Sequence, residues 1–396
     1  MQDWLRERLA ELEAAGLLRD PADADVRQQL SESAGAEPRD PRDSRAGLRP
    51  RLLDACSNDY LGLAAAPVSR ETFEELGSLR IGAGASRLVQ GTFPEQLVLE
   101  QELASWTRCE AVLLTSSAFA ANLGALPALC DSHSVIISDA LNHASIVDAC
   151  RLARCQVVVT PHLDLTAIEA ALRKRSPVAR AWVVLETLFS MDGDCPDLPA
   201  VRALCDRYGA GLLLDEAHSL GTLGPEGAGL AAAQGVRAEV LVGGLGKAVG
   251  AQGGFLAGSG ELRTWLWNRA RSFVFSTAPS PLLSHVVLAQ VRRARRADAA
   301  RERLSALSRE LRQALQARGI PLAIDGIGPI VPVRLGSNDR AMRAMAVLRE
   351  RAILAQAIRP PTVPVGAARL RLTVHADWPD DAVSRLAEGV EAACAS

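Results

Sequence analysis

The stretch Glu239-Val240-Leu241-Val242-Gly243-Gly244-Leu245-Gly246-Lys247 decides how the rest of the chain is interpreted, because it joins a short apolar run to a glycine-rich turn with one lysine. The apolar run predicts a buried strand. Lysine is scarce in this chain, and the only other one is Lys174. An amine among glycines is suited to attack a carbonyl group, since desolvation or nearby positive charge activates lysine. A surface lysine in a flexible loop is the plain alternative.

A second polar cluster, Asp215-Glu216-Ala217-His218, directly follows the apolar run Gly211–Leu214. An acid at the end of one strand and a lysine beyond the next strand are what a pyridoxal phosphate site requires. The lysine bonds to the cofactor, and the acid keeps the pyridine nitrogen protonated so that the ring accepts electrons. An ordinary strand-end acid is the alternative here too. Taken together, the two motifs favour pyridoxal phosphate as the cofactor.

Outward from these motifs, short apolar runs alternate with helical stretches from Ala111 onward. Their lengths and bulky aliphatic residues predict strands buried on both faces, and hence an α/β fold with a mostly parallel seven-stranded sheet wrapped by helices. Ligands of such sheets bind beyond the carboxyl ends of the strands. The seven runs are Ala111–Thr115, Val135–Ser138, Gln156–Thr160, Ala181–Glu186, Gly211–Leu214, Glu239–Val242 and Gly254–Ala257.

Composition predicts three parts along the chain. Residues 1–48 combine a charged helical pattern with an arm rich in Asp, Arg, Pro and Ser, residues 49–281 form the large cofactor-binding domain, and residues 282–396 form a smaller α+β C-terminal domain. In the last part we expect one long helix over Leu282–Arg318, strands Ile330–Leu335 and Arg369–Val374, and helices Met342–Arg351 and Ala382–Ala393.

Bulk properties exclude several classes of function. The chain has 396 residues, 48% of them hydrophobic and 23% charged, which is typical of a globular protein. A net charge of −2 gives no electrostatic reason to expect nucleic acid or an anionic membrane as partner. No run of about 18 apolar residues could span a bilayer. The eight cysteines have no metal-ligand spacing, so we expect no metal site and a cytoplasmic location.

Three further strand ends carry polar residues that could do chemistry. His143 lies in Asp139-Ala140-Leu141-Asn142-His143, after the second run; a structural histidine is the alternative. Ser117-Ala118-Phe119 joins the first run to a helix, where small residues leave backbone N–H groups available to phosphate. Ser190 follows the fourth run and could simply belong to a turn.

With these pieces in order, the chain resembles the α-oxoamine synthase family of pyridoxal phosphate enzymes, which has the aspartate-aminotransferase-like fold (fold type I). The resemblance runs from about residue 55 to 380. It rests on the motifs Asn58-Asp59-Tyr60-Leu61-Gly62-Leu63, Leu141-Asn142-His143-Ala144-Ser145, Phe189-Ser190-Met191-Asp192-Gly193-Asp194, Asp215-Glu216-Ala217-His218 and Leu245-Gly246-Lys247.

The resemblance implies roles for individual residues. The implied catalytic residues are Lys247, His143, Asp215 and His218. The implied cofactor contacts are these four together with Ser190, the phosphate-binding Ser117, Ala118, Phe119 and Gly244, and Thr277, which would reach the phosphate of the neighbouring subunit in a homodimer. The implied substrate-binding residues are Arg371, Thr362, Asn58 and Arg19. A solvated strand arginine is the alternative for Arg371.

Ala357–Pro364 and Arg369–Thr373 are most similar to the member of the family that serves biotin synthesis. That similarity implies condensation of L-alanine with pimeloyl-CoA or pimeloyl-acyl carrier protein and loss of carbon dioxide. Two alternatives stay open: a family member that uses another amino acid or acyl thioester, and a non-catalytic protein of this fold with a binding or regulatory role.

Four positions depart from the family pattern. Gly244 stands where a threonine usually contacts phosphate, and Ala118 replaces the usual glycine. Gln96 and Trp378 stand where relatives often have histidine. We therefore expect a weaker hold on the phosphate and an open acyl specificity.

Overall fold

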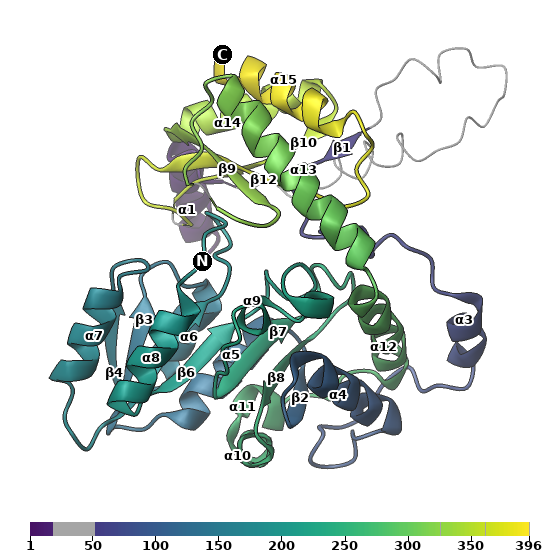
Figure 1. The fold of residues 1–396 in the computed structure, drawn as a ribbon, viewed down its shortest axis with the longest axis vertical. Helices are drawn as coiled ribbons and strands as arrows, with labels where there is room; N and C mark the ends of the chain where they lie inside the picture. Colours follow the sequence, from purple (N-terminus) through teal and green to yellow (C-terminus); the bar gives the residue numbers. More distant parts are fainter. Residues whose placement is uncertain (19–51, 325, 361, 396) are drawn as a thin grey trace. The chain divides into compact units, whose positions relative to one another are not determined.

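The structure, a computed structural model, describes residues 1–18, 52–324, 326–360 and 362–395. The chain divides into two compact units (Figure 1). The large unit comprises residues 58–304, and the small unit combines residues 1–57 with 305–396. This division falls later than the expected boundary after residue 281, because helix α12 (Pro281–Arg295) packs against α4 (Pro94–Thr107) within the large unit.

The large unit is built around a seven-stranded sheet in the order β2-β8-β7-β6-β5-β3-β4. The pairs from β4 to β7 are parallel, whereas β8 runs antiparallel to both of its neighbours. Each strand overlaps one of the seven apolar runs, and only Glu239 of the predicted residues falls outside its strand, so the predicted mostly parallel sheet is confirmed. The strands are β2 (Ala111–Thr115), β3 (Ser134–Asp139), β4 (Gln156–Thr160), β5 (Arg180–Glu186), β6 (Gly211–Asp215), β7 (Val240–Gly244) and β8 (Gly254–Gly258).

Burial explains why these segments form strands. All six residues of β3 are buried, and Leu212, Leu213 and Leu214 of β6 are fully buried. A strand covered on both faces is a nearly continuous apolar run, as these are. The edge strand β4 is more exposed, which agrees with its single neighbour.

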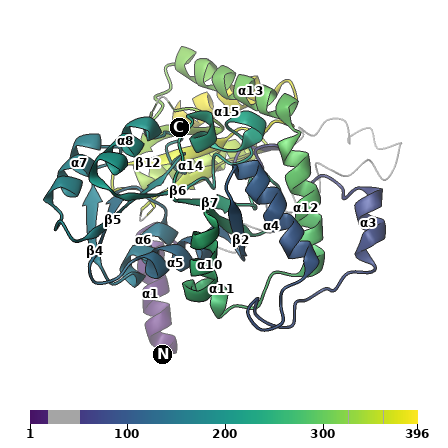
Figure 2. The ribbon, with the colours of Figure 1, turned by 60° about the horizontal axis from the view of Figure 1, so that its bottom comes forward.

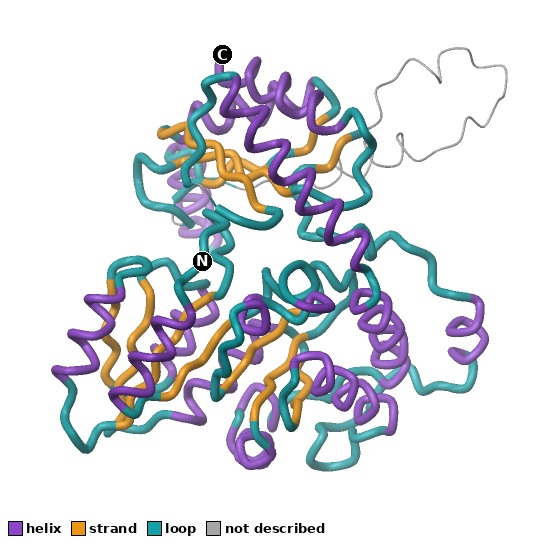
Figure 3. Tube along the Cα trace, viewed as in Figure 1, coloured by secondary structure: helices purple, strands orange, loops and turns teal. Residues whose placement is uncertain are grey.

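Helices cover both faces of the sheet (Figure 2). Helices α5, α6, α10 and α11 lie on one side, where Leu126, Ile146 and Phe273 join the core, and α7 and α8 lie on the other. Figure 3 shows the alternation of strand and helix along this unit. The remaining elements here are α3 (Arg70–Leu76), α5 (Ala118–Leu129), α6 (Ala144–Leu152), α7 (Leu165–Lys174), α8 (Leu198–Tyr208), a 3-10 turn (Pro225–Gly227), α9 (Leu230–Ala233), α10 (Gly260–Arg269) and α11 (Arg271–Val274).

The single long helix expected over Leu282–Arg318 is wrong. The segment forms α12 and a separate helix α13 (Asp298–Ala317). The guanidinium of Arg301 explains the break, because it donates to the carbonyl oxygens of Ala294 (2.6 Å) and Arg295 (2.8 Å). The last carbonyls of a helix have no partner four residues on, so the guanidinium gives these two a charged donor where α12 ends.

The small unit has the predicted α+β content. Its three-stranded antiparallel sheet has the order β11-β12-β9, and a short parallel pair joins β1 to β10. Its elements are α1 (Gln2–Ala14), β1 (Leu53–Asp54), β9 (Ile330–Gly336), α14 (Asn338–Glu350), β10 (Ile353–Leu354), β11 (Gln356–Ile358), β12 (Ala368–Thr373) and α15 (Ala382–Ala395). None of the helices in the described residues combines the length and apolar character needed to cross a membrane.

Candidate active site

Ionisable side chains gather where the strands β5, β6 and β7 end. Asp215 is the last residue of β6, Glu186 is the last residue of β5, and the two face each other in the parallel register. Both side chains are buried. Lys247 lies in the turn that follows β7, and both Asp215 and Lys247 act electrostatically on Glu186. The acid and the lysine that the sequence singled out therefore share one edge of the sheet.

The carboxylate of Asp215 is held in a fixed orientation. Its Oδ2 accepts a hydrogen bond of 2.7 Å from Nδ2 of Asn122, and its Oδ1 accepts one of 2.9 Å from the backbone N–H of Ala217. Asn122 is fully buried on α5 and also donates to Oγ of Ser145 (2.9 Å). Each carboxylate oxygen retains a lone pair, so Asp215 can accept a further donor.

Lys247 is half-buried in a tight turn. The N–H of Gly250 donates to its carbonyl oxygen (2.8 Å), and the N–H of Ala251 donates to that of Leu245 (2.9 Å). Gly250 has φ +66, and a Cβ at this position would lie 2.4 Å from the nitrogen of Ala64. Only glycine fits such a backbone. The turn that presents the amine is therefore fixed by packing and hydrogen bonds.

His143 caps helix α6 beside this group. Its Nδ1 lies 2.8 Å from Oγ of Ser145, and its ring meets Phe119 edge-on with centroids 6.2 Å apart. Desolvation lowers the pKa of His143; Asp215 opposes that shift and the charge of Lys247 adds to it. His143 is exposed, and its lowered pKa favours the neutral form of the imidazole at neutral pH.

His218 lies near the same strand end and is buried. Its Nδ1 is 2.7 Å from the hydroxyl of Tyr60, which in turn donates to Oδ1 of Asn58 (3.0 Å). The predicted residue Asn58 is thus connected to His218 by hydrogen bonds through Tyr60. The sequence did not indicate this connection, because Tyr60 and His218 lie 158 residues apart. Ser190, also buried, lies in the loop that follows β5.

The predicted phosphate-binding turn forms the N-terminus of α5. Ser117 is the N-cap, and its Oγ accepts from the N–H of Ala120 (3.1 Å). Strand β8 passes so closely that a Cβ at Gly254 would lie 2.2 Å from the nitrogen of Ala118. A Cβ at Gly244 would lie 3.5 Å from Cβ of Ala118 and 3.2 Å from that of Ala217. The absence of side chains on both glycines leaves the first turn of the helix open, as an anion site requires.

Two buried acids at this edge have different surroundings. Burial, followed by the charge of Asp215, raises the pKa of Glu186 to about 8, and its Oε1 has no hydrogen-bond partner among the described residues. Glu216 instead accepts from the N–H groups of Leu230 (2.9 Å) and Ala231 (2.8 Å) and so anchors α9. Sequence reasoning grouped Glu216 with the site and missed Glu186, whose apolar strand gave no signal.

The other predicted residues belong to other elements of the chain. Thr277 is exposed in the loop after α11. Arg371 is buried on β12 and Thr362 is exposed, both in the small unit. Arg19 lies outside the described residues.

Gln96 and Trp378, which depart from the family pattern, make hydrogen bonds that hold the fold together. Gln96 is fully buried and donates from Nε2 to the carbonyl oxygen of Pro279 (2.6 Å), while its Oε1 caps the start of α4. The indole N–H of Trp378 donates to the carbonyl oxygen of Asp54 (2.7 Å).

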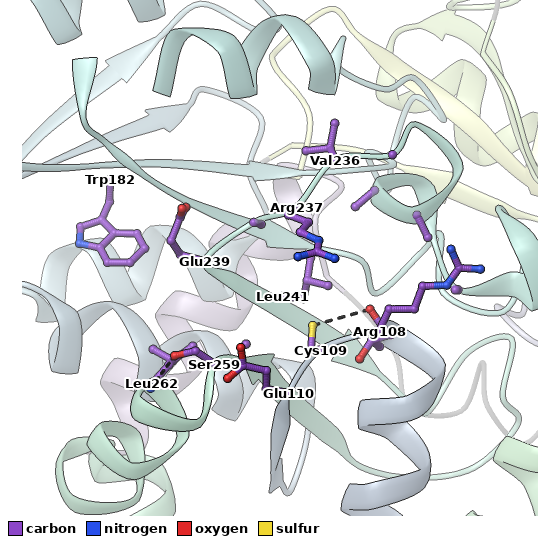
Figure 4. A pocket seen from close by; sticks show the side chains of 17 residues that line it. Arg108, Cys109, Glu110, Trp182, Val236, Arg237, Glu239, Leu241, Ser259 and Leu262 are labelled. Carbon is purple, nitrogen blue, oxygen red and sulfur yellow. Dashed lines mark hydrogen bonds between the residues drawn. The ribbon is translucent and has the colours of Figure 1, made fainter. Parts of the chain in front are cut away.

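A cavity of ≈ 620 Å³ lies at the opposite edge of the sheet (Figure 4). It is lined by residues that precede β2 and β7 and follow the antiparallel β8, among them Glu110, Glu239 and Ser259. Its carboxylates already serve the fold, since Glu110 accepts from the N–H of Gly260 (3.1 Å) and Glu239 from that of Leu212 (2.6 Å). Size alone therefore does not mark the site of chemistry.

The donor set at the carboxyl edge fits pyridoxal phosphate. Asp215 offers a fixed acceptor for the pyridine N–H, Lys247 offers the amine, and the open first turn of α5 offers N–H groups for the phosphate. The imidazole of His143 offers a flat surface beside them. These features together meet the chemical needs of each part of the cofactor.

Comparison with known proteins identifies the family of the chain. The family model for class I and II aminotransferases matches residues 50–390. An 8-amino-7-oxononanoate synthase from Anaeromyxobacter dehalogenans is 43% identical over 383 residues, covering 94% of this chain and 91% of the relative. A variant of serine palmitoyltransferase from S. paucimobilis, solved with bound PLP and myriocin, superposes with a TM-score of 0.83 at 28% identity, covering 86% and 87% of the two chains.

An 8-amino-7-oxononanoate synthase from Francisella tularensis shares the fold, with a TM-score of 0.75 at 24% identity over 86% of this chain and 97% of the other. The chain therefore belongs to the class I and II aminotransferase family and, within it, to the α-oxoamine synthases, as a pyridoxal-phosphate-dependent acyltransferase related to the 8-amino-7-oxononanoate synthases.

Proposed function

We propose that the protein condenses L-alanine with a pimeloyl thioester to give 8-amino-7-oxononanoate, carbon dioxide and the free thiol carrier, a step of biotin synthesis. The observation that carries this proposal is the 43% identity, over 94% of the chain, to an enzyme named for that product. The intact group of Lys247, Asp215 and His143 at one sheet edge supports catalysis over a purely binding or regulatory role.

Pyridoxal phosphate, when bound, supplies a ring that withdraws the electron pair released at Cα of the amino acid. Asp215 is proposed to accept the N–H of the pyridine ring and keep that nitrogen protonated. Asn122 and Ala217 act through Asp215, because their hydrogen bonds fix its two oxygens. They are positioning residues in this scheme.

Lys247 is proposed to bind the cofactor and then to move protons. Its amine removes the Cα proton of bound alanine, and it returns a proton to the same carbon after carbon dioxide has left. In the proposal His143 covers one face of the ring, which its lowered pKa suits because a neutral imidazole stacks without carrying charge into the site. His218 and Ser190 hold the phenolic oxygen, with His218 oriented by Tyr60.

The phosphate is proposed to bind the N–H groups of Ala118 and Phe119 with the hydroxyl of Ser117 nearby, at the positive end of α5. Gly244 borders the same turn without a hydroxyl. We therefore expect the phosphate to depend mainly on backbone donors in this protein.

Arg371, Thr362, Asn58 and Arg19 stay proposed substrate ligands, with Arg371 assigned to the carboxylate of alanine. A guanidinium binds a carboxylate through two parallel hydrogen bonds, which a shorter amide cannot reproduce. The Arg371→Gln variant should therefore raise KM for L-alanine more than KM for the thioester.

A homodimer in the cytoplasm completes the proposal. Ile81, Val89 and Phe275 are 83%, 80% and 73% exposed, and their segments adjoin, since the N–H of Ala278 donates to the carbonyl oxygen of Ala85 (3.0 Å). Exposed apolar side chains on adjoining segments are typical of an interface. Thr277, next to this patch, is proposed to reach the phosphate of the partner subunit. Cell fractionation tests the location.

The second candidate is a synthase that uses serine with a longer acyl thioester. The observation in its favour is the similarity to a serine palmitoyltransferase, at a TM-score of 0.83. The higher sequence identity to 8-amino-7-oxononanoate synthase, 43% against 28%, favours L-alanine and a pimeloyl group.

Product analysis with paired substrates tests the proposal. The purified holoenzyme is given L-alanine, glycine or L-serine, each with pimeloyl or palmitoyl thioesters on coenzyme A or acyl carrier protein. We expect the mass of 8-amino-7-oxononanoate with alanine and a pimeloyl group, and kcat/KM at least ten-fold lower for the other pairs. A preference for serine with palmitoyl-CoA would support the second candidate instead.

A further inference from the structure

The imidazole of His162 lies between two carboxylates. In the loop after β4, its Nδ1 is 2.8 Å from Oδ1 of Asp139 and its Nε2 is 2.8 Å from Oδ2 of Asp194. The side chains of Asp139 and Asp194 are only 0% and 10% exposed, and that of His162 is 19% exposed. One ring thus joins the last residue of β3 to the loops that follow β4 and β5, at the carboxyl edge of the sheet.

Both ring nitrogens must carry hydrogen to donate to two carboxylates, because a neutral imidazole has one donor and one acceptor. Burial lowers the pKa of His162, but hydrogen bonds to Asp139 and Asp194 outweigh it and raise the pKa to about 10. The bridge therefore contains an imidazolium at neutral pH, and both of its bonds are charge-assisted.

Asp139 connects His162 to the segment that carries His143. Its Oδ1 also accepts from the N–H of Leu141 (2.8 Å), and its Oδ2 accepts from the N–H of Leu163 (2.8 Å). Leu163 has φ +55, a left-handed conformation that leucine rarely adopts. The backbone keeps this conformation where it brings His162 and the N–H of Leu163 to the same carboxylate. His143 lies four residues after Asp139.

Asp194 likewise connects His162 to the loop that carries Ser190. The N–H of Phe189 donates to the carbonyl oxygen of Asp194 (2.9 Å), and the N–H of Gly193 donates to that of Phe189 (2.9 Å). The ring of Phe189 meets His162 edge-on, with centroids 4.5 Å apart. Backbone hydrogen bonds therefore hold the two ends of the segment 189–194, which contains Ser190, and the side chain of Asp194 binds the imidazolium.

We propose that His162 is a positioning residue for cofactor binding, which fixes the loops of His143 and Ser190 to each other through Asp139 and Asp194. The inference rests on the proposed function, since His143 and Ser190 are assigned there to the two sides of pyridoxal phosphate. His162 itself touches neither cofactor nor substrate in this scheme.

The test compares the affinity of the apoprotein for pyridoxal phosphate in the parent and in His162→Gln. The glutamine amide is neutral and has both of its N–H donors on one nitrogen, so it does not replace the charged bonds that the two ring nitrogens make. We therefore expect affinity to fall at least ten-fold, with KM for L-alanine changing less than two-fold at saturating cofactor. The matched control is His285→Gln, which removes an imidazole 2.7 Å from Glu75, between α12 and α3. It should keep the parent affinity within two-fold.

A double variant distinguishes a positioning role of His162 from a general loss of stability. Asp194→Asn should weaken cofactor affinity about three-fold in the parent background and have almost no further effect in His162→Gln, because the charge-assisted bond to the imidazolium is already lost there. Should His162→Gln fail to fold, Asp194→Asn alone carries the test.

Parent-like affinity in His162→Gln, or additive losses in the double variant, would overturn the inference while leaving the proposed function intact. Conversely, a parent that binds the cofactor but forms no product contradicts only the proposed function. The midpoint of thermal unfolding of each apoprotein shows whether an affinity change merely follows stability.

Discussion

Asp215 is the residue on which the proposed chemistry depends most directly. Its carboxylate is fixed by Asn122 and Ala217, so an amide at this position keeps the shape but cannot hold a proton on the pyridine nitrogen. Asp215→Asn turns an amide N–H toward one of these donors, which costs about 1–3 kcal/mol, so it should still fold and should slow exchange of the Cα hydrogen of alanine at least a hundred-fold. Deuterium exchange followed by NMR checks this. Exchange at the parent rate would remove Asp215 from its assigned role.

Substitution of Gly244 by serine should strengthen the binding of pyridoxal phosphate rather than weaken it. A Cβ here meets Ala217 at 3.2 Å, so a branched threonine is crowded while serine needs only a small shift. A hydroxyl on the phosphate contributes roughly 1.5–3 kcal/mol. Gly244→Ser should therefore bind pyridoxal phosphate about ten-fold more tightly than Gly244→Ala, the control for crowding. Equal dissociation constants, measured by titration of the apoprotein, would show that the added hydroxyl does not reach the phosphate.

At this scale the sequence indicated residues whose chemistry is local. Lys247 and Asp215 were recognisable because each directly follows an apolar run. Asn122, Glu186 and His162 were not, because their partners lie far away in the chain: Asp215 is 93 residues from Asn122, and Asp194 is 32 residues from His162. Only folding brings such pairs together.

At the scale of elements, periodicity predicted all seven strands of the large sheet but not the break between α12 and α13. The apolar pattern continues across the break, whereas the side chain of Arg301 turns back to bind the last carbonyls of α12. A pattern of apolar residues does not contain that information.

Arg301→Ala should consequently destabilise the protein. Two carbonyl oxygens lose a charged donor, and loss of a hydrogen bond to a charged group costs about 1.5–3 kcal/mol. We expect a drop of about 2 kcal/mol in the free energy of unfolding, measured with denaturant. Arg309→Ala, on the exposed side of the same helix, is the control and should change it by less than about 0.5 kcal/mol.

The raised pKa of His162 predicts that the stability of the apoprotein depends on pH. The pKa of His162 is raised from 6.5 to about 10, so its contribution is complete below pH 6.5 and is lost as pH rises towards 10. The charged groups that face it are Asp139 and Asp194. Between pH 7 and pH 10 the apoprotein should lose on the order of 3 kcal/mol more stability than His162→Gln does.

Glu186 titrates in the same range, but it is present in both proteins and cancels in this comparison. Denaturant unfolding at each pH is the measurement. Parallel curves for the two proteins would show that the imidazolium does not contribute.

At the scale of the whole molecule, the proposed dimer makes each site depend on two chains. A mixed dimer of Lys247→Ala and Thr277→Ala chains would have one site with both lesions and one with neither. Random exchange makes half of the dimers mixed, each with one intact site of two, so at limiting cofactor mixing should raise activity towards about a quarter of that of the parent. If subunit exchange is confirmed by mass and activity stays at the average of the two variants, Thr277 does not serve the partner.

The division of the chain was harder to predict than its elements. The predicted large domain ended at residue 281, but α12 stays with the large unit because it packs on α4, and residues 52–57 belong with the C-terminal residues through the pairing of β1 with β10. Contacts between segments that lie far apart in sequence determine such boundaries. Composition along the chain does not report them.

The measurement that tests the central claim most directly follows the carboxyl carbon of alanine. The holoenzyme is incubated with L-alanine labelled at the carboxyl carbon and with pimeloyl-CoA or pimeloyl-acyl carrier protein, with Lys247→Ala as the control. The proposed chemistry predicts one labelled carbon dioxide for each unlabelled 8-amino-7-oxononanoate and each free thiol, and none of the three from the control. Thiol release without labelled carbon dioxide, or a product that retains the label, would contradict it.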